Sequence, residues 1–86
     1  MKSITDNWSV VDGELVRSFR FSTFAAAIAF VKDVGQIAET ENHHPSILLE
    51  YTTVTLKTVS KDKGNIITDL DYGLAAKIDE NYVFYG

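Results

Sequence analysis

STFAAAIAFVKDVGQIAETENHHP, residues 22–45, contains the clearest helical pattern in the chain. Apolar side chains recur along it at helical spacing, with charged and polar side chains on the opposite side. Ser22 and Thr23 are both favourable N-cap residues, and Pro45 both disfavours a helical conformation at His44 and cannot continue the hydrogen-bond ladder. The pattern predicts a helix that ends near Asn42 and is apolar enough on one side to lie flat on a sheet. Its apolar positions are Phe24, Ala27, Ile28, Phe30, Val31, Val34, Gly35, Ile37 and Ala38.

Two extended segments precede this helix. Residues 8–12 are β-prone and stop at Asp12-Gly13, a dipeptide favoured in tight hairpin turns, so a second strand is expected over residues 14–21. The second segment alternates with the period of a half-covered strand, and Arg17 falls on its apolar face. The sequence therefore predicts a hairpin whose apolar face also carries a charged side chain, Arg17.

Two further strands follow the proline. Residues 47–51 and 54–59 alternate between apolar and polar side chains, and the chain is expected to turn around Thr52 and Thr53.

A second helix is predicted near the end of the chain. Residues 61–65, KDKGN, indicate a polar loop, and Thr68 with Asp71 three residues later has the spacing of a capping box. The tail VFYG, residues 83–86, is expected to add a short extended piece. The inward stripe of the helix is predicted to be Leu70, Leu74, Ile78 and Tyr82.

The order strand, strand, helix, strand, strand, helix predicts an α+β fold. We expect a four-stranded antiparallel sheet with both helices packed on one face. Residues 1–86 are expected to form a single domain, because the sequence contains no internal repeat, low-complexity segment or linker.

Composition excludes several classes of function. The net charge of −4 argues against a direct nucleic-acid partner, which would require clustered Lys and Arg. Cysteine is absent, so no disulfide, thiolate nucleophile or thiolate metal site is available. No apolar run approaches the roughly 20 residues needed to cross a bilayer, and no leader follows Met1. We therefore expect a soluble, cytoplasmic protein without a membrane partner.

The adjacent pair His43-His44 lies at the corner between the first helix and the third strand. Histidine has an unperturbed pKa of about 6.5, so it can give or take a proton near neutral pH. The alternative interpretation is a pair of corner histidines, one packed and one solvated. A metal site is not favoured, because zinc takes three or four protein ligands and no spacing of carboxylates completes such a set here.

Several segments together resemble the pterin-4a-carbinolamine dehydratase family. The family pattern has an acidic residue before His-His-Pro, an aromatic residue after it, a third histidine, and an Asp that opens the last helix. WSVVDGELVRSFRFSTFAAAIAFV is similar to the family's first hairpin and central helix, so the resemblance extends from Trp8 to Tyr82. Longer members have a helix before the first strand, which the segment ahead of Trp8 is expected to lack. The matching residues are Glu39, His43-His44-Pro45, Tyr51 and the segment ITDLDYGLA.

This resemblance implies dehydration of a 4a-hydroxytetrahydropterin to the quinonoid dihydropterin by acid–base catalysis. His43 and His44 would contact the pterin and share the proton transfers, and Asp71 corresponds to the family's site aspartate. No metal or other cofactor is implied, since the pterin is the substrate. The positions implied to bind substrate are Glu39, Pro45 and Tyr51.

The third histidine of the family pattern is replaced in this chain, because the matching position holds Lys61. An unperturbed lysine stays charged at pH 7, so it can donate a hydrogen bond to a leaving oxygen but cannot accept a proton. Lys61 is thus either a substitute for the third histidine or an ordinary solvated side chain. Asp71 and Glu39 have structural alternatives too, as a helix cap and as part of an exposed helix end.

Two functions therefore stay open: an enzyme of the dehydratase type, with full or reduced activity depending on the role of Lys61, and a non-catalytic pterin-binding or protein-interaction module on the same fold. A homodimer or homotetramer is expected in either case. The family forms such oligomers, and a small four-stranded sheet has exposed edges.

Overall fold

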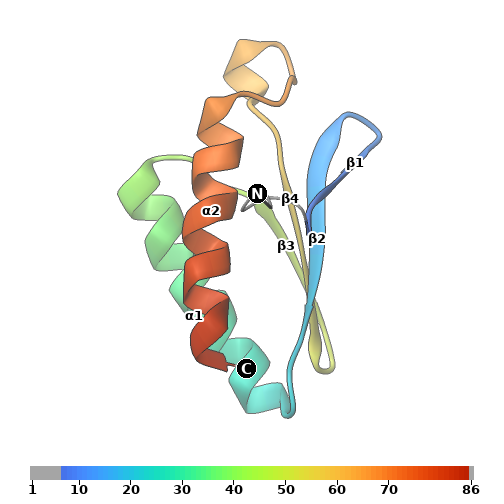
Figure 1. Ribbon diagram of the computed structural model, residues 1–86, viewed down its shortest axis with the longest axis vertical. Helices are drawn as coiled ribbons and strands as arrows, with labels where there is room; N and C mark the ends of the chain where they lie inside the picture. Colours follow the sequence, from blue (N-terminus) through green and yellow to red (C-terminus); the bar gives the residue numbers. More distant parts are fainter. Residues whose placement is uncertain (1–6, 86) are drawn as a thin grey trace, which may run out of the picture.

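The computed structural model describes residues 7–85, which form a four-stranded antiparallel sheet covered on one face by two helices (Figure 1). The order confirms the predicted α+β arrangement. The elements are β1 (Ser9–Val11), β2 (Glu14–Arg20), α1 (Phe24–Glu41), β3 (Ser46–Glu50), β4 (Thr53–Thr58), the 3₁₀ turn η1 (Lys61–Lys63), α2 (Asp69–Tyr82) and the 3₁₀ turn η2 (Val83–Tyr85).

The strands lie in the order β1-β2-β4-β3, so β2 and β4 are central and β1 and β3 form the edges. The register pairs Leu15 with Thr58 and Phe19 with Val54, which places alternate residues of both strands on the helix-covered face. Leu15, Phe19 and Val54 are buried there. Thr58 is buried as well, although it is polar.

The core lies between the sheet and the two helices. Helix α1 contributes Ala27, Phe30, Val34 and Ala38, and α2 contributes Leu74, Ala75 and Ile78. Two predicted core positions of α1 are wrong, since Phe24 is 53% exposed and Ile28 is 46% exposed. The fully buried stripe of α1 is narrower than predicted and leaves both of them out, since it consists of Ala27, Phe30, Val34 and Ala38.

Leu70 was also predicted to face inward, but it is 47% exposed. The inward direction at the first turn of α2 belongs to its neighbour Asp71, which is fully buried. Because Asp71 and Leu70 are adjacent, both cannot point at the sheet. The buried stripe of α2 therefore begins with a carboxylate, which matters for the site described below.

Arg17 lies on the helix-covered face of β2, as the strand pattern predicted. Its Nη1 atom is 2.7 Å from Oδ1 of Asp79 on α2, and the indole Nε1 of Trp8 donates to the same carboxylate at 3.0 and 3.1 Å. The guanidinium also sits over the ring of Phe19, 4.3 Å from its centroid. Burial raises the pKa of the Asp79 carboxyl, although Trp8 and Arg17 counteract this effect. This cluster ties β2 to the C-terminal half of α2.

The chain end differs from the expected extended piece. Val83 has helical backbone angles, so η2 continues directly from α2. The ring of Tyr85 then packs edge-on against Phe21 and Phe30, with centroids 5.5 and 5.4 Å apart. Aromatic packing with helical geometry therefore replaces the strand predicted for residues 83–86, of which residue 86 lies outside the described part.

The expectation that no helix precedes the first strand falls mainly on residues 1–6, which lie outside the described residues. Between residues 7 and 85, neither α1 nor α2 combines the length and the apolar character that crossing a bilayer would require.

Candidate functional site

The C-terminal end of α1 sets the backbone position of the two histidines. Asn42 adopts the left-handed conformation (φ 54°) and caps the helix, and the backbone N–H of His43 donates to the carbonyl of Ala38 at 3.0 Å. Pro45 then leads directly into β3 at Ser46. The corner is therefore fixed by backbone hydrogen bonds and by the proline, as the sequence predicted for the end of this helix.

His43 contacts the aspartate that opens α2. Its Nε2 atom is 2.6 Å from Oδ1 of Asp71, and the two side chains are 11% and 0% exposed. A carboxylate accepts hydrogen bonds only, so Nε2 carries the proton in this contact. The other ring nitrogen, Nδ1, has no hydrogen-bond partner within residues 7–85.

The Asp71 carboxylate accepts three hydrogen bonds besides its contact with His43. Its Oδ1 also accepts from the hydroxyl of Thr58 at 2.6 Å, and its Oδ2 accepts from the hydroxyl of Ser60 and the backbone N–H of Thr68, both at 2.9 Å. Burial alone would raise the pKa of Asp71, but the hydrogen bonds from Thr58, the Thr68 backbone, His43 and Ser60 outweigh burial and lower the pKa below its ordinary value. Asp71 is thus a buried carboxylate kept ionised by its donors.

His44 has a carboxylate partner of its own. Its Nε2 lies 2.5 Å from Oε2 of Glu39 in the last turns of α1, and the two side chains are 58% and 76% exposed. The structure thus gives each histidine one acidic partner. One pair, His43 with Asp71, is buried, and the other, His44 with Glu39, is open to solvent.

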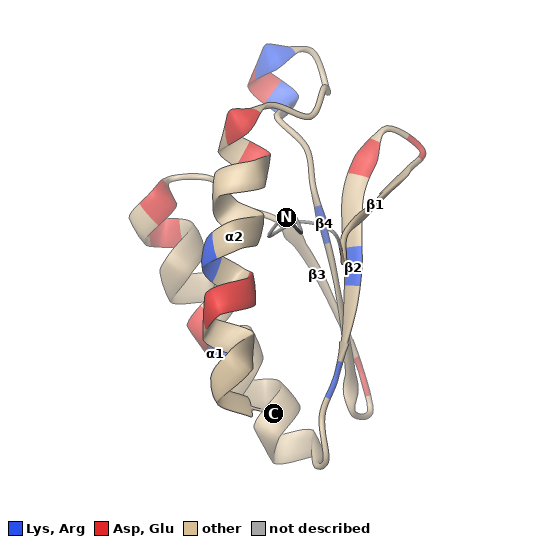
Figure 2. Cartoon of the chain, viewed as in Figure 1, with Lys and Arg blue, Asp and Glu red and all other residues tan. Residues whose placement is uncertain are grey.

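Both histidines line an open cavity of about 560 Å³, a volume within the usual range for small-molecule sites. Acidic residues at the end of α1 and in the first turn of α2, together with basic residues in η1, surround this end of the molecule (Figure 2). Lys61 lines the cavity too, so it lies beside the pair; its correspondence to the third histidine of the family stays a prediction. The cavity residues are Glu41, Asn42, His43, His44, Val59, Lys61, Asp62 and Leu70.

Tyr51 is not brought to this cavity by its own chain. It lies in the turn after β3, is 86% exposed, and is separated from Pro45 by the five residues of that strand, roughly 17 Å of extended chain. Pro45 is half-buried beside the histidines but does not line the cavity. The substrate-binding roles of Tyr51 and Pro45 stay predictions.

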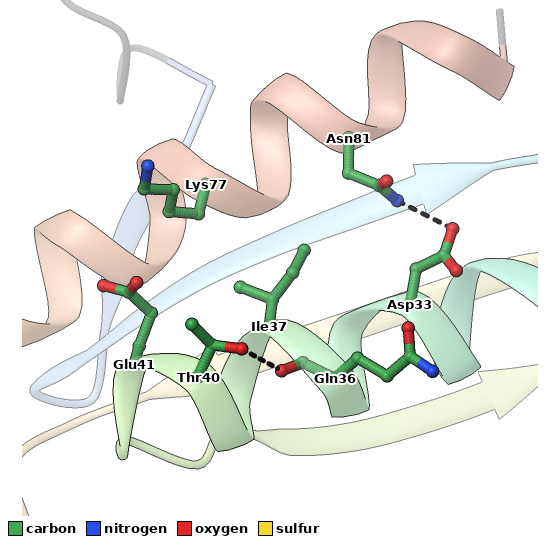
Figure 3. Close-up of a pocket in the computed structure, with 7 residues that line it drawn as sticks. All are labelled: Asp33, Gln36, Ile37, Thr40, Glu41, Lys77 and Asn81. Carbon is green, nitrogen blue, oxygen red and sulfur yellow. Dashed lines mark hydrogen bonds between the residues drawn. The ribbon is translucent and has the colours of Figure 1, made fainter.

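A second hollow lies between α1 and α2 and is about half as large, near 270 Å³ (Figure 3). Some of its polar groups are paired: Asp33 accepts from Asn81 at 3.0 Å and from the hydroxyl of Tyr85, and the Thr40 hydroxyl donates to the backbone carbonyl of Gln36. No histidine lines it. The paired chemistry is therefore concentrated at the first cavity.

Sequence reasoning missed Thr58 and Ser60. The available signal was the polar Thr58 at an inward position of β4, following Val54 and Leu56 in the alternation. Such a position implies a buried hydroxyl that needs a partner. The partner, Asp71, could not be identified without knowing how α2 sits on β4.

The arrangement is suited to proton transfer. One imidazole lines the cavity, has no hydrogen-bond partner at Nδ1 within residues 7–85 and contacts a buried anion through Nε2, and the other is exposed beside a glutamate. Within the described residues, no three side chains of the metal-ligating types come together in one group. The groups that the structure does assemble are acids and bases.

Comparison with known proteins gives consistent results. The sequence profile of the family described as "Pterin 4 alpha carbinolamine dehydratase" matches residues 1–81. A protein of Chloroflexus aurantiacus named "Putative pterin-4-alpha-carbinolamine dehydratase" is 46% identical over 74 residues, which are 86% of this chain and 78% of that protein. A protein of Metallosphaera sedula with the same name is 39% identical over 74 residues, covering 86% of this chain and 76% of that protein.

Two solved structures share the fold. A transcriptional coactivator/pterin dehydratase from Brucella melitensis superposes with a TM-score of 0.81 at 30% identity, covering 94% of this chain and 84% of that one. A pterin dehydratase-like protein identified as a RuBisCO assembly factor in the alpha-carboxysome gives 0.73 at 20% identity, covering 93% and 94%. At 20% identity the second likeness shows the fold alone.

Proposed function

The chain belongs to the pterin-4a-carbinolamine dehydratase family, and on this premise we propose that it dehydrates a 4a-hydroxytetrahydropterin to the quinonoid dihydropterin. The observation that carries the proposal is the pair of histidines at one cavity, each with its own carboxylate partner. Family membership supports the substrate class, and the geometry supports the type of chemistry.

The reaction needs one acid and one base. The C4a–O bond breaks and the oxygen leaves as water after taking a proton, while N5 loses its proton and a C4a=N5 double bond forms. Loss of water is not a redox step, so the reaction requires no external electron donor or acceptor. In this proposal the pterin is the substrate and the reaction uses neither a metal nor another cofactor.

We assign the base role to His43. With its Nε2–H directed at Asp71, its Nδ1 lone pair is available to the N5 proton, and the buried carboxylate stabilises the imidazolium that forms. His44 takes the acid role, because its exposed ring lines the cavity and its Nε2 contacts the carboxylate of Glu39. Lys61 at the cavity wall would donate a hydrogen bond to the leaving oxygen, which partly replaces a third histidine.

The test is the rate of quinonoid dihydropterin formation. The wild-type protein is expected to exceed the spontaneous rate, and the variant that lacks both imidazoles, His43→Ala/His44→Ala, is expected to return to it. The double variant at equal concentration controls for non-specific effects of added protein. No acceleration by the wild type would end the proposal.

The alternative function is a pterin-binding module without turnover, which the predicted replacement of the third histidine by Lys61 would favour. Titration with a reduced pterin analogue separates the two functions. Binding without turnover supports the module. Turnover supports the enzyme, and neither binding nor turnover leaves a structural or partner-binding role.

Self-association as a homodimer or homotetramer is part of the proposal. Among residues 7–85 the edge strand β3 pairs only with β4, and its Ile47 and Leu48 are 39% and 52% exposed. An unprotected apolar edge of this kind is a template for pairing with another chain. Sedimentation at high micromolar concentration is expected to show a species larger than the 9.6 kDa monomer, and a monomer alone would contradict it.

The cytoplasmic location expected from the composition also stays a prediction, which subcellular fractionation would check.

A further inference from the structure

The two oxygens of Asp71 have different partners. Oδ1 accepts from the hydroxyl of Thr58 and contacts Nε2 of His43, both at 2.6 Å. Oδ2 accepts from the hydroxyl of Ser60 and the backbone N–H of Thr68, both at 2.9 Å. Oδ2 therefore holds the start of α2 to the end of β4, whereas Oδ1 is shared between the cavity histidine and Thr58.

Packing does not account for the Thr58 hydroxyl. Thr58 is 1% exposed at an inward position of β4, after the apolar residues Val54 and Leu56. Valine has nearly the same shape and would fill this position without a buried polar atom. Within residues 7–85 the Thr58 hydroxyl makes one hydrogen bond, to Asp71. Any influence of this hydroxyl on His43 is therefore exerted through the Asp71 carboxylate.

We propose that Thr58 is a positioning residue for His43: by donating to Oδ1 of Asp71 it shares that oxygen with the imidazole and limits how firmly the carboxylate retains the protonated ring. A buried carboxylate oxygen with a single donor gains more from an imidazolium than from a neutral imidazole. A second donor keeps the oxygen satisfied in both states. His43 can then accept a proton and release it again.

Other charged groups also act on His43. Asp71 contacts it from α2, Glu41 lies at the end of α1, His44 is adjacent in sequence, and Lys61 and Asp62 line the cavity from η1. Of these groups, only Asp71 is hydrogen-bonded to the Thr58 side chain. A change in the titration of His43 after substitution of Thr58 therefore reports on the shared oxygen.

The experiment compares Thr58→Val with Thr58→Ser and Ser60→Ala by ¹⁵N NMR titration of His43. In Thr58→Val the midpoint is expected to rise by about 0.5 to 1 pH unit, the equivalent of one hydrogen bond. Thr58→Ser keeps a hydroxyl and is expected to restore the wild-type midpoint. Ser60→Ala removes a donor from Oδ2 and leaves both donors of Oδ1, so it is expected to move the midpoint less.

Activity gives a second readout, and this part rests on the proposed function. The acid limb of the pH–rate profile is expected to move upward in Thr58→Val and to return in Thr58→Ser. If the wild type is inactive but the NMR midpoint moves as described, the proposed function fails and the role of Thr58 stands. If the wild type is active and the midpoint does not move, the role of Thr58 fails alone.

Three results overturn the inference: an unchanged or lowered midpoint in Thr58→Val, no restoration in Thr58→Ser, or an equal shift in Ser60→Ala. If Thr58→Val does not fold, Thr58→Cys replaces it. A thiol of similar size is a weaker donor than a hydroxyl, so the expected shift has the same direction.

Discussion

Replacing His44 with alanine is expected to lower the rate of quinonoid dihydropterin formation by about 10² to 10⁴-fold, the usual contribution of a positioned general acid or base. The physical reason is that the oxygen leaving C4a must be protonated, and His44 is the cavity imidazole with an exposed carboxylate partner. A change of 10²-fold corresponds to about 2.7 kcal/mol of barrier. The measurement is kcat from initial rates of quinonoid formation, after subtraction of the spontaneous rate.

Stability provides the necessary control for this result. The His44 side chain is 58% exposed, so its removal is expected to change the free energy of unfolding by less than about 0.5 kcal/mol. Glu39→Gln is the matched variant, because it keeps the shape of the partner and removes its charge. Its rate is expected to lie between those of the wild type and His44→Ala. A His44→Ala protein that turns over at the wild-type rate would remove His44 from the mechanism.

Asp71→Asn is expected to reduce both stability and rate. The amide presents N–H groups where the carboxylate accepted four hydrogen bonds, so donors that were satisfied lose their acceptor. Because the side chain is fully buried, we expect a loss of about 3 kcal/mol in the free energy of unfolding at pH 7, measured by urea denaturation. The rate is expected to fall by about 10² or more, since His43 loses the anion that stabilises its protonated form.

Asp69→Asn is the matched control for helix electrostatics. Asp69 lies in the same first turn of α2 but is exposed and makes no side-chain hydrogen bond within residues 7–85. Its substitution is expected to cost about 0.5 kcal/mol through the helix dipole and to leave the rate unchanged. Equal effects of the two substitutions would mean that Asp71 acts only as a first-turn charge.

The stability difference between the wild type and Asp71→Asn is expected to depend on pH. The pKa of Asp71 is lowered from 3.8 in the folded state, so its ionised form contributes stability that is fully present above the unfolded value. This contribution is lost as pH falls through the lowered folded pKa. The difference should therefore be constant near neutral pH and shrink below about pH 4. A difference that grew on acidification would contradict an ionised Asp71.

The bounds of helix α1 and the position of the first hairpin could be predicted from neighbouring residues in the sequence. Helix α1 begins after Thr23 and ends at Asn42 because the cap residue, the apolar period and the proline all act within a few residues of one another. The same holds for the hairpin at Asp12-Gly13. Which positions of each helix are buried was less predictable: Phe24, Ile28 and Leu70 are apolar yet exposed, since burial depends on how the helix is rotated on the sheet.

For the candidate site, too, some residues could be identified from the sequence, whereas their contacts could not. His43, His44 and their corner were identified from the sequence, and Asp71 was identified through its spacing from Thr68. The pairing of His43 with Asp71 joins residues 28 positions apart, and no local pattern indicates it. Tyr51 was grouped with the site by resemblance, but the length of β3 separates it from the histidines within one chain.

The sequence alone determined the order of elements, both ends of α1, the capped start of α2 and the presence of two adjacent imidazoles at a corner, because these depend on neighbours within about one helical turn. Only the tertiary structure decided which carboxylate each imidazole meets and that Thr58 shares an oxygen with His43. These contacts exist because packing α2 across the end of β4 buries Asp71, and a buried carboxylate must collect donors from every element around it.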